Sequence, residues 1–574
     1  MIDCAEKRHR RPFLAGIRLP IIAAILLWFA QPPFSWWPVG AVALLPLIQL
    51  VSRADELQRA EWYAIWIAGF AFWLLSLQGL RHAHSMMFLG WFALSGYLAL
   101  YWLVFVYSAR WFHHQRSFPI GIAVAIAWLG QEVLRNYLLT GISACMLGHT
   151  MVDVPVVIQI ASWFGSYGVS LFVVMLNVLS YGVMCSIAAS QPEKSMGAVD
   201  RITAVSWITA VLIFGIWQID RSSDQTGDVV GNFLLVQRSE PIEYTQPTSR
   251  AVEIYQAYAQ QTLRALSQQD RPIDAVIWPE SMYSAGNPWM EIHKKNGSSQ
   301  DGGGSSLTAS AQAVGLTPAD LLVAVDESQR YFEQRSAMLH QASIAALSEP
   351  QASIDFLVGC GVMRYSETPE VYCGLVQFGS GGKVKQWYGK NHLVMFGEYI
   401  PLVSSLPWVQ SLIPPGMGLN QGGQPEPMQL ANARVLPNIC IETAVERVAV
   451  NHLRSLRGKG REIDLIVTIT NDGWFDQSSI IDHHLRCAQL VAAGIGKPIL
   501  SAANNGPTAW IDAQGRIVER VETGQHGVIV ASPKSSNTNT LYSRWGAWPV
   551  APFGFATCWP LLLALRTFTR RRKR

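Results

Sequence analysis

Long runs of apolar residues with few charged positions dominate the first 220 residues of this sequence. A helix that spans a membrane needs about 20 residues of this kind. Seven runs approach that length, and an eighth stands alone near the C-terminus. The runs are Leu14–Ala30, Trp37–Val51, Trp62–Leu80, Met86–Tyr107, Phe118–Val133, Val156–Ile187, Ile202–Ile219 and Trp545–Leu565. The pattern predicts a multi-pass α-helical membrane domain of about eight helices, with seven transmembrane helices in residues 1–220.

Between residues 221 and 544 the pattern changes to short apolar runs that alternate with segments of helical period. The strand-like runs are Gly231–Val236, Asp274–Trp278, Asp355–Val362, Tyr372–Phe378, Ile463–Ile469, Pro498–Ser501 and Gly527–Ala531. Helical periodicity lies between them, for example over Arg250–Gln268 and Ile480–Gly494. The alternation predicts one α/β domain. It is interrupted by an insertion over about residues 285–320, in which "NGSSQDGGGSS" at Asn296–Ser306 has the composition of a flexible linker.

Composition and charge place this architecture in a membrane. Hydrophobic residues make up 50% of the chain and charged residues 15%, well below the quarter or so of a typical soluble protein. Basic residues collect in alternate loops and in the tail that follows the last apolar run. They include Lys7, Arg8, Arg53, Arg59, Arg110, Arg116, Lys194, Arg201 and Arg570–Arg574. The positive-inside rule then predicts cytoplasmic termini, an α/β domain outside the cytoplasm, and a final helix and basic tail over 545–574.

The net charge of +4 is therefore a signal of topology, and it gives no reason to expect a nucleic-acid partner. We interpret the first apolar run as a spanning helix and not as a cleaved signal peptide, because further spans follow and no small-x-small cleavage site does.

Three polar residues at predicted strand ends suggest chemistry. Glu280 closes "VIWPES", Lys390 lies in "WYGKNHLVMFGEYIP" and Cys440 lies in "LPNICIETA". Singly, they fit a helix cap, a surface lysine and a small core residue. Together, they are the parts of a nucleophilic acyl-transfer site: a thiol, a carboxylate that takes its proton, and a cation where an oxyanion forms. A neighbouring lysine also favours the thiolate.

Five motifs in sequence order carry a family resemblance. "WPES", "GKNHLVMFGEYIP", "NICIET", "TNDGWF" and "AANNGPTAWID" resemble the nitrilase superfamily, and specifically its membrane branch, the apolipoprotein N-acyltransferases. Val156–Asn177 and Leu541–Val550 are similar to that family's membrane-region segments. The resemblance implies a nitrilase-like four-layer αββα sandwich with a Glu280-Lys390-Cys440 triad. It also implies supporting roles for Glu398 in "FGEY" and for Glu442.

The activity that the resemblance implies is a ping-pong acyl transfer. Cys440 would take an acyl chain from a phospholipid as a thioester, and the amino group of a diacylglyceryl-cysteine lipoprotein would accept it, as the last step of bacterial lipoprotein maturation. This implies a monomer in the bacterial inner membrane that works without cofactor or metal, with its catalytic domain in the periplasm. The alternative is a membrane-tethered amidase or lipid hydrolase that uses water as the acceptor.

Two positions depart from the family pattern. The family has a glycine-asparagine pair and a nearby tryptophan after the first strand of the outer domain, whereas this chain has "VQRSEPIEYTQ" at Val236–Gln246. Ile441 occupies the place of the family's aromatic residue after the nucleophile. The substrate contacts that those parts make in the family are therefore not carried over to this chain, whereas the triad is.

Two loop segments are further candidates for the site. In "TNDGWF", Asn471 and Asp472 are expected to fix backbone groups beside Cys440, with Trp474 and Phe475 as a pocket wall. The alternative is an Asx-turn with core packing, and the two are compatible. The apolar segment Leu393–Gly418 is a candidate lid over the thioester, and the alternative is an ordinary core-facing loop.

Cysteine and histidine positions leave two further alternatives. Cys360 and Cys373 either form a disulfide or pack as small hydrophobic residues. His483 and His484 with Cys487 invite a metal site, but no further ligands stand at suitable spacing. We therefore expect these histidines to be ordinary helix residues.

Overall fold

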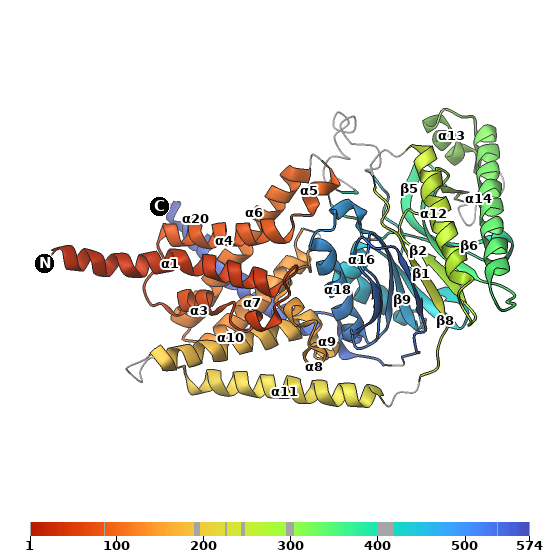
Figure 1. The fold of residues 1–574 in the computed structure, drawn as a ribbon. Coiled ribbons are helices and arrows are strands. Elements are labelled where there is room, and N and C mark those ends of the chain that lie inside the picture. The colour runs from red at the N-terminus through yellow and green to blue at the C-terminus, as the bar shows by residue number, and fades with distance from the viewer. Residues whose placement is uncertain are drawn as a thin grey trace.

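The computed structural model describes residues 2–84, 87–139, 141–188, 196–223, 227–242, 247–293, 303–395, 397–398, 418–536 and 538–572. A bundle of apolar helices forms one half of the molecule, and an α/β sandwich forms the other (Figure 1). Both ends of the chain lie at the side of the bundle away from the sandwich (Figure 1). The division agrees with the two architectures that the hydrophobic pattern predicts.

The bundle contains helices from both ends of the chain. They are α1 (Ile2–Ala30), α2 (Trp37–Gly40), α3 (Leu45–Ser52), α4 (Arg59–Ser76), α5 (Leu80–Ala83), α6 (Met87–Arg110), α7 (Ile120–Tyr137), α8 (Pro155–Ile158), α9 (Ala161–Phe164), α10 (Ser166–Ala188), α11 (Ala198–Ser223) and α20 (Ala551–Arg572). Among the described residues, four helical segments of the bundle have the length and hydropathy of a membrane span. They are Met87–Gln115, Ser166–Ile187, Ala198–Arg221 and Trp548–Thr567.

Two of the expected spans are broken. Trp37–Val51 forms the short helices α2 and α3 instead of one continuous helix. Pro38 and Pro46 stand in the first turns of these helices. A proline, which has no N–H donor, is tolerated in the first turn of a helix, whereas in the interior of one continuous helix it would interrupt the hydrogen bonding. Val156–Ile187 becomes continuous only in α10, after Gly165 with a φ of +62°. The total of eight spans stays a prediction.

The sandwich consists of two facing mixed sheets. The first has seven strands in the order β13-β1-β2-β4-β5-β6, with β3 beside β4; the second has six in the order β12-β11-β10-β9-β8-β7. The strands are β1 (Phe233–Gln237), β2 (Ala275–Trp278), β3 (Trp289–Ile292), β4 (Asp355–Tyr365), β5 (Pro369–Phe378), β6 (Val384–Gly389), β7 (Met428–Leu430), β8 (Ala433–Ile439), β9 (Leu465–Asn471), β10 (Ile499–Asn504), β11 (Thr508–Ile511), β12 (Ile517–Val521) and β13 (Gly527–Ala531).

Three apolar clusters define four layers. Phe233, Leu357 and Val467 belong to the core between the two sheets. Helices α12 (Thr248–Leu266) and α14 (Pro318–Ala346) cover the outer face of the first sheet, and α17 (Glu446–Gly458) and α18 (Ile480–Ile495) cover that of the second. The expected αββα arrangement is confirmed.

The insertion is more ordered than its composition suggests. Its region contains β3 and α13 (Gly303–Ala313), and α14 begins at Pro318. The end of the predicted linker is therefore helical, while its residues 296–302 lie outside the described part of the chain.

Helix α18 joins the sandwich to the bundle. Its Leu490 and Ala493 belong to the apolar core of the bundle. Arg486 donates to the carbonyl of His149 at 2.6 Å and pairs with Asp153 at 2.8 Å. The second sheet's helical layer thus rests on the bundle, which fixes the position of the strand ends described next.

Candidate active site

Both sheets supply the predicted triad, each residue at the end of a strand. Glu280 follows β2 and Lys390 follows β6 in the first sheet, whereas Cys440 follows β8 in the second. The Asn471 N–H, at the end of β9, donates to Oε2 of Glu280 at 3.1 Å and so links the two sheets. The structure thus brings these strand ends together at one rim.

Glu280 is a buried carboxylate with a thiol neighbour. Its side chain is held by Asn471 on one oxygen, and the thiol of Cys373 donates to the other at 3.1 Å. Burial raises the pKa of Glu280, and the charge of Lys390 opposes part of that rise. A carboxylate with a raised pKa is a stronger base, which suits a group that must take a proton from a thiol.

Lys390 is 1% exposed and lies between two carboxylates. Its ammonium donates to Oε1 of Glu398 at 2.6 Å and lies 3.7 Å from Oε1 of Glu280. Burial alone would lower the pKa of Lys390, but the two carboxylates reverse the effect and raise it well above its usual value. Lys390 is therefore a fixed positive charge. Glu398 is itself held by the N–H of Val394 at 2.8 Å.

Cys440 has a backbone conformation that a non-glycine residue rarely adopts, with φ +50° and ψ −113°. Hydrogen bonds hold it there, because its N–H donates to the Ile469 carbonyl at 2.8 Å and its carbonyl accepts from Thr443 N–H at 3.1 Å. Burial raises the pKa of the Cys440 thiol to about 12, against the opposing charge of Lys390. The resting group is therefore a thiol that needs a base.

Glu442 acts on the site through the backbone. The carboxylate is fully buried and accepts four hydrogen bonds: from Ile439 N–H (2.7 Å), Asn391 N–H (2.6 Å), His392 N–H (3.0 Å) and the Tyr388 hydroxyl (2.8 Å). These donors come from the segments that carry Cys440 and Lys390. Glu442 thus ties the nucleophile's loop to the lysine's loop, and burial raises its pKa to about 7.

The turn after β9 matches the Asx-turn interpretation and also reaches the site. The side-chain oxygen of Asn471 accepts from Gly473 N–H at 3.3 Å and from the Asn504 amide at 3.0 Å. Trp474 is half-buried in the short helix η6 (Asp472–Phe475), which packs against α5 of the bundle. The rim of the site therefore meets the bundle here. The expectation that Trp474 walls the pocket stays a prediction.

Cys373 is a site residue that the sequence analysis did not identify. In the β4–β5 ladder Cys373 pairs with Gly361 and Cys360 pairs with Gly374, so the two thiols point to opposite faces of the sheet. Cys360 packs in the outer cluster and Cys373 against the core between the sheets. Both thiols are free, which rules out the disulfide alternative in this structure. Side chains along a strand point alternately to its two faces, and this alternation is the sequence signal that could have placed Cys360 and Cys373 on opposite faces.

His484 is, after Cys373, the second residue beside the triad that the sequence analysis did not assign to the site. Its Nε2 lies 3.1 Å from the carbonyl oxygen of Cys440, and its Nδ1 lies 3.5 Å from Oδ1 of Asp472. Burial would lower the pKa of His484, but Asp472 reverses this and raises it. His483 instead contacts Cys145, at 3.4 Å. Across the described ranges, no group of three or more His, Cys, Asp or Glu residues is placed to hold a metal ion.

Two sequence expectations fall on residues that the structure describes only in part. The candidate lid Leu393–Gly418 is described at residues 393–395, 397–398 and 418 only, and its other positions lie outside the described residues. In Val236–Gln246, residues 243–246 also lie outside them. The described part of this segment connects to the site, because Asn504 accepts from Glu240 N–H at 3.0 Å and donates to Asn471.

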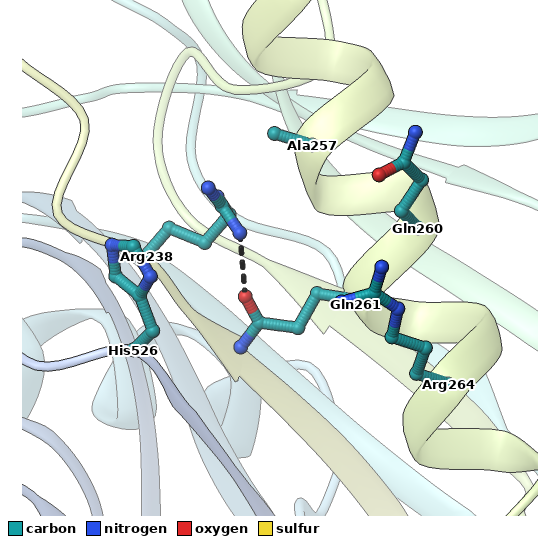
Figure 2. Close-up of a pocket in the computed structure, with 6 residues that line it drawn as sticks. All are labelled: Arg238, Ala257, Gln260, Gln261, Arg264 and His526. Carbon is teal, nitrogen blue, oxygen red and sulfur yellow. Dashed lines mark hydrogen bonds between the residues drawn. The ribbon is translucent and has the colours of Figure 1, made fainter.

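A surface hollow of about 410 Å³ lies elsewhere on the sandwich. Figure 2 shows its lining by side chains of α12, by Arg238 and by His526, with Arg238 donating to Gln261 at 3.1 Å. Glu280, Lys390 and Cys440 do not line it. The hollow is therefore separate from the candidate active site.

Comparisons with known proteins match both halves of the chain. Residues 23–179 match the apolipoprotein N-acyltransferase N-terminal domain, and residues 246–541 match the carbon-nitrogen hydrolase family. The apolipoprotein N-acyltransferase of Rhodopirellula baltica is 40% identical over 96% of this chain and 97% of its own length. That of Azotobacter vinelandii is 27% identical over 98% and 97%. Among solved structures, an amidase from Nesterenkonia sp. is 11% identical and covers 55% of this chain and 94% of its own, with a TM-score of 0.33.

Proposed function

Because the chain belongs to the apolipoprotein N-acyltransferases, an acyltransferase family, we propose that it transfers an acyl chain from a phospholipid to the α-amino group of a diacylglyceryl-cysteine lipoprotein. The observation that carries the proposal is the group of charges formed by Glu280, Lys390 and Glu398 at the rim where the strand that precedes Cys440 also ends. At this rim Glu280 can act as the base, Lys390 as the fixed cation and Cys440 as the nucleophile.

In the first half-reaction Glu280 accepts the Cys440 proton as the sulfur attacks an ester carbonyl of the phospholipid. Proton removal accompanies attack, because a thiol with a pKa of about 12 is almost fully protonated at neutral pH. Lys390 stabilises the oxyanion of the tetrahedral intermediate. The C–O bond then breaks, Glu280 returns the proton to the departing lysophospholipid, and an acyl thioester remains on Cys440.

In the second half-reaction the neutral α-amino group of the lipoprotein attacks the thioester. Glu280 accepts a proton from the nitrogen, and Lys390 again stabilises the oxyanion. The C–S bond breaks, the proton returns to sulfur, and an N-acyl amide leaves. No cofactor enters this sequence of steps.

The proposed orientation places the sandwich in the periplasm of a bacterial inner-membrane protein, with both termini in the cytoplasm. Two observations support it: the basic residues of the N-terminus and tail, and the position of both termini at the side of the bundle away from the sandwich (Figure 1). The contact between η6 and α5 brings the rim of the site beside the bundle, where lipid substrates would arrive.

Trapping of the intermediate tests the function. Purified protein given phospholipid alone should accumulate a hydroxylamine-labile acyl group, which peptide mapping should place on Cys440 and not on the neighbouring Cys373. Cys440→Ala should abolish the adduct, and Glu280→Gln should prevent its formation. A diacylated lipopeptide with a free N-terminus should discharge it into an N-acyl product, whereas an N-acetylated lipopeptide should not. Equal release of free fatty acid with either peptide would favour the hydrolase.

A further inference from the structure

A second cavity lies where the bundle meets the sandwich, away from the triad. It has a volume of about 690 Å³, and its walls come from the α8–α9 region, the end of α11, the turn after β11 and the segment before α19 (Leu541–Trp545). Glu280, Lys390 and Cys440 do not line it. Helix α18 separates the two places: His484 near its start contacts Cys440, while Ala493 near its end lines the cavity.

One wall of this interdomain cavity is aromatic and carries a cation. Trp163 packs against Phe214 at 5.2 Å, Phe214 against Trp217 at 5.8 Å, and the Arg221 guanidinium lies 5.3 Å from the Trp217 ring. Trp163 and Trp217 remain 42% and 50% exposed. Such aromatic side chains with an arginine are typical of the level where membrane meets water.

The part of the lining that comes from the sandwich is polar and uncharged. It includes Gln514, Ser535, Thr538 and Thr540. Gln159 links the two parts of the lining, because its amide donates to the Gln514 carbonyl at 3.1 Å. Among the described residues that line the cavity there is no Asp or Glu, and Arg221 is the one Arg or Lys. The charge of the lining therefore favours an anionic group.

The cavity continues an apolar surface. Only 17% of the 18-residue apolar window within the span Ala198–Arg221 is buried inside the protein, and Ile202, Ile213 and Ile216 are 66%, 64% and 60% exposed. In a membrane this face of α11 contacts acyl chains. A ligand that fits both features has apolar chains along α11 and a phosphate beside Arg221.

We propose that the interdomain cavity binds a phospholipid whose phosphate pairs with Arg221, at a site distinct from the one where acyl chains are transferred. The lipid bridges the bundle and the sandwich, because its headgroup contacts walls that belong to both. The proposal requires no acyl transfer, so it stands or falls separately from the proposed function.

The test uses the full-length Cys440→Ala protein in nanodiscs, which cannot form the thioester. A phosphatidylglycerol with a photoactivatable group near the headgroup should crosslink to peptides containing Trp217 or Thr538. Arg221→Ala should reduce that yield about tenfold, the effect expected for loss of a hydrogen bond to a charged group. Arg221→Lys should retain most of it. Crosslinks near residues 390–395, in the candidate active site, should not change and serve as an internal standard.

Arg116→Ala is the matched control, since Arg116 also stacks on a tryptophan, at 4.7 Å from Trp111, but does not line this cavity. It should leave the crosslinks unchanged. Equal crosslinking by a diacylglycerol probe with the same chains and photoactivatable group would overturn the proposal, because the phosphate would then contribute nothing. Full competition by inorganic phosphate would also overturn it, since the site would then hold a free anion. Normal crosslinking in Arg221→Ala would do the same.

Discussion

At the scale of single residues, the site is a balance of charges around Glu280. Burial raises the pKa of this carboxyl, and the charge of Lys390 lowers it. The negative charge of Glu398 raises it further, and the hydrogen bond from the Cys373 thiol lowers it. The proposed mechanism needs Glu280 ionised and Lys390 protonated. Changes to their neighbours should therefore move the two limbs of the pH–rate profile in directions that the contacts fix.

Cys373→Ala should shift the acid limb to higher pH. The substitution removes a hydrogen bond that favours the ionised Glu280, so the pKa of Glu280 rises and the base stays protonated over a wider acid range. Cys373→Ser keeps a donor and should stay close to wild type. The measurement is kcat/KM for acyl transfer against pH. A uniform loss at every pH would indicate a packing defect instead.

Glu398→Gln should shift both limbs to lower pH. Lys390 loses the carboxylate that contributes most to its raised pKa, so its ammonium deprotonates at lower pH. Glu280 loses a negative neighbour, so its own pKa falls too. The same pH–rate measurement checks this, with Glu370→Gln, on the neighbouring strand β5, as the control. An acid limb that moves upward would contradict the charge balance.

At the scale of elements, strand ends carry the site, and buried hydrogen bonds fix the loops that follow them. The sequence predicts these strand ends because β-branched and aliphatic runs stop at Glu280, Asn471 and Cys440. The sequence does not predict which residues of these loops form hydrogen bonds with one another. Three of the four donors to Glu442 come from β6 and the loop after it, in the other sheet. The thiol of Cys373 reaches Glu280 from another strand of the same sheet, 93 residues away in sequence. No local sequence pattern encodes such contacts.

Glu442→Ala should destabilise the protein by about 3 kcal/mol or more, because it leaves up to four donors without an acceptor in a buried place and each costs about 1–3 kcal/mol. Unfolding followed by circular dichroism in detergent measures this. The exposed Glu519→Ala on β12 should change stability by less than about 0.5 kcal/mol. Activity lost without any change in stability would mean that Glu442 touches substrate.

At the scale of the whole molecule, hydropathy predicts the division into bundle and sandwich, but not how helices break. Trp37–Val51 has the composition of a span, yet Pro38 and Pro46 divide it into α2 and α3. A hydropathy window averages over such prolines. The docking of the two halves through Arg486, Asp153 and Glu446 is likewise absent from any local pattern, because its partners are far apart in sequence.

Reporter fusions should establish the orientation of the molecule. Alkaline phosphatase fused near Ser222 should be active, because the proposed periplasmic sandwich begins there, and a fusion after Arg574 should be inactive. A fluorescent protein that folds only in the cytoplasm should give the reverse result at both points. Phosphatase activity after Arg574 would place the tail outside and contradict the charge asymmetry.

The attachment of α18 to the bundle determines whether the sandwich would stay soluble if it were separated from the bundle. Leu490 and Ala493 are 0% and 3% exposed, packed among residues of the bundle, and Ser166 at the start of α10 donates to the buried Glu446 at 3.0 Å. Cutting the chain at the bundle would open this apolar face to water and leave Glu446 without that donor. A secreted fragment of residues 227–544 should therefore aggregate, so a water-soluble descendant of this enzyme would first need a new surface on α18.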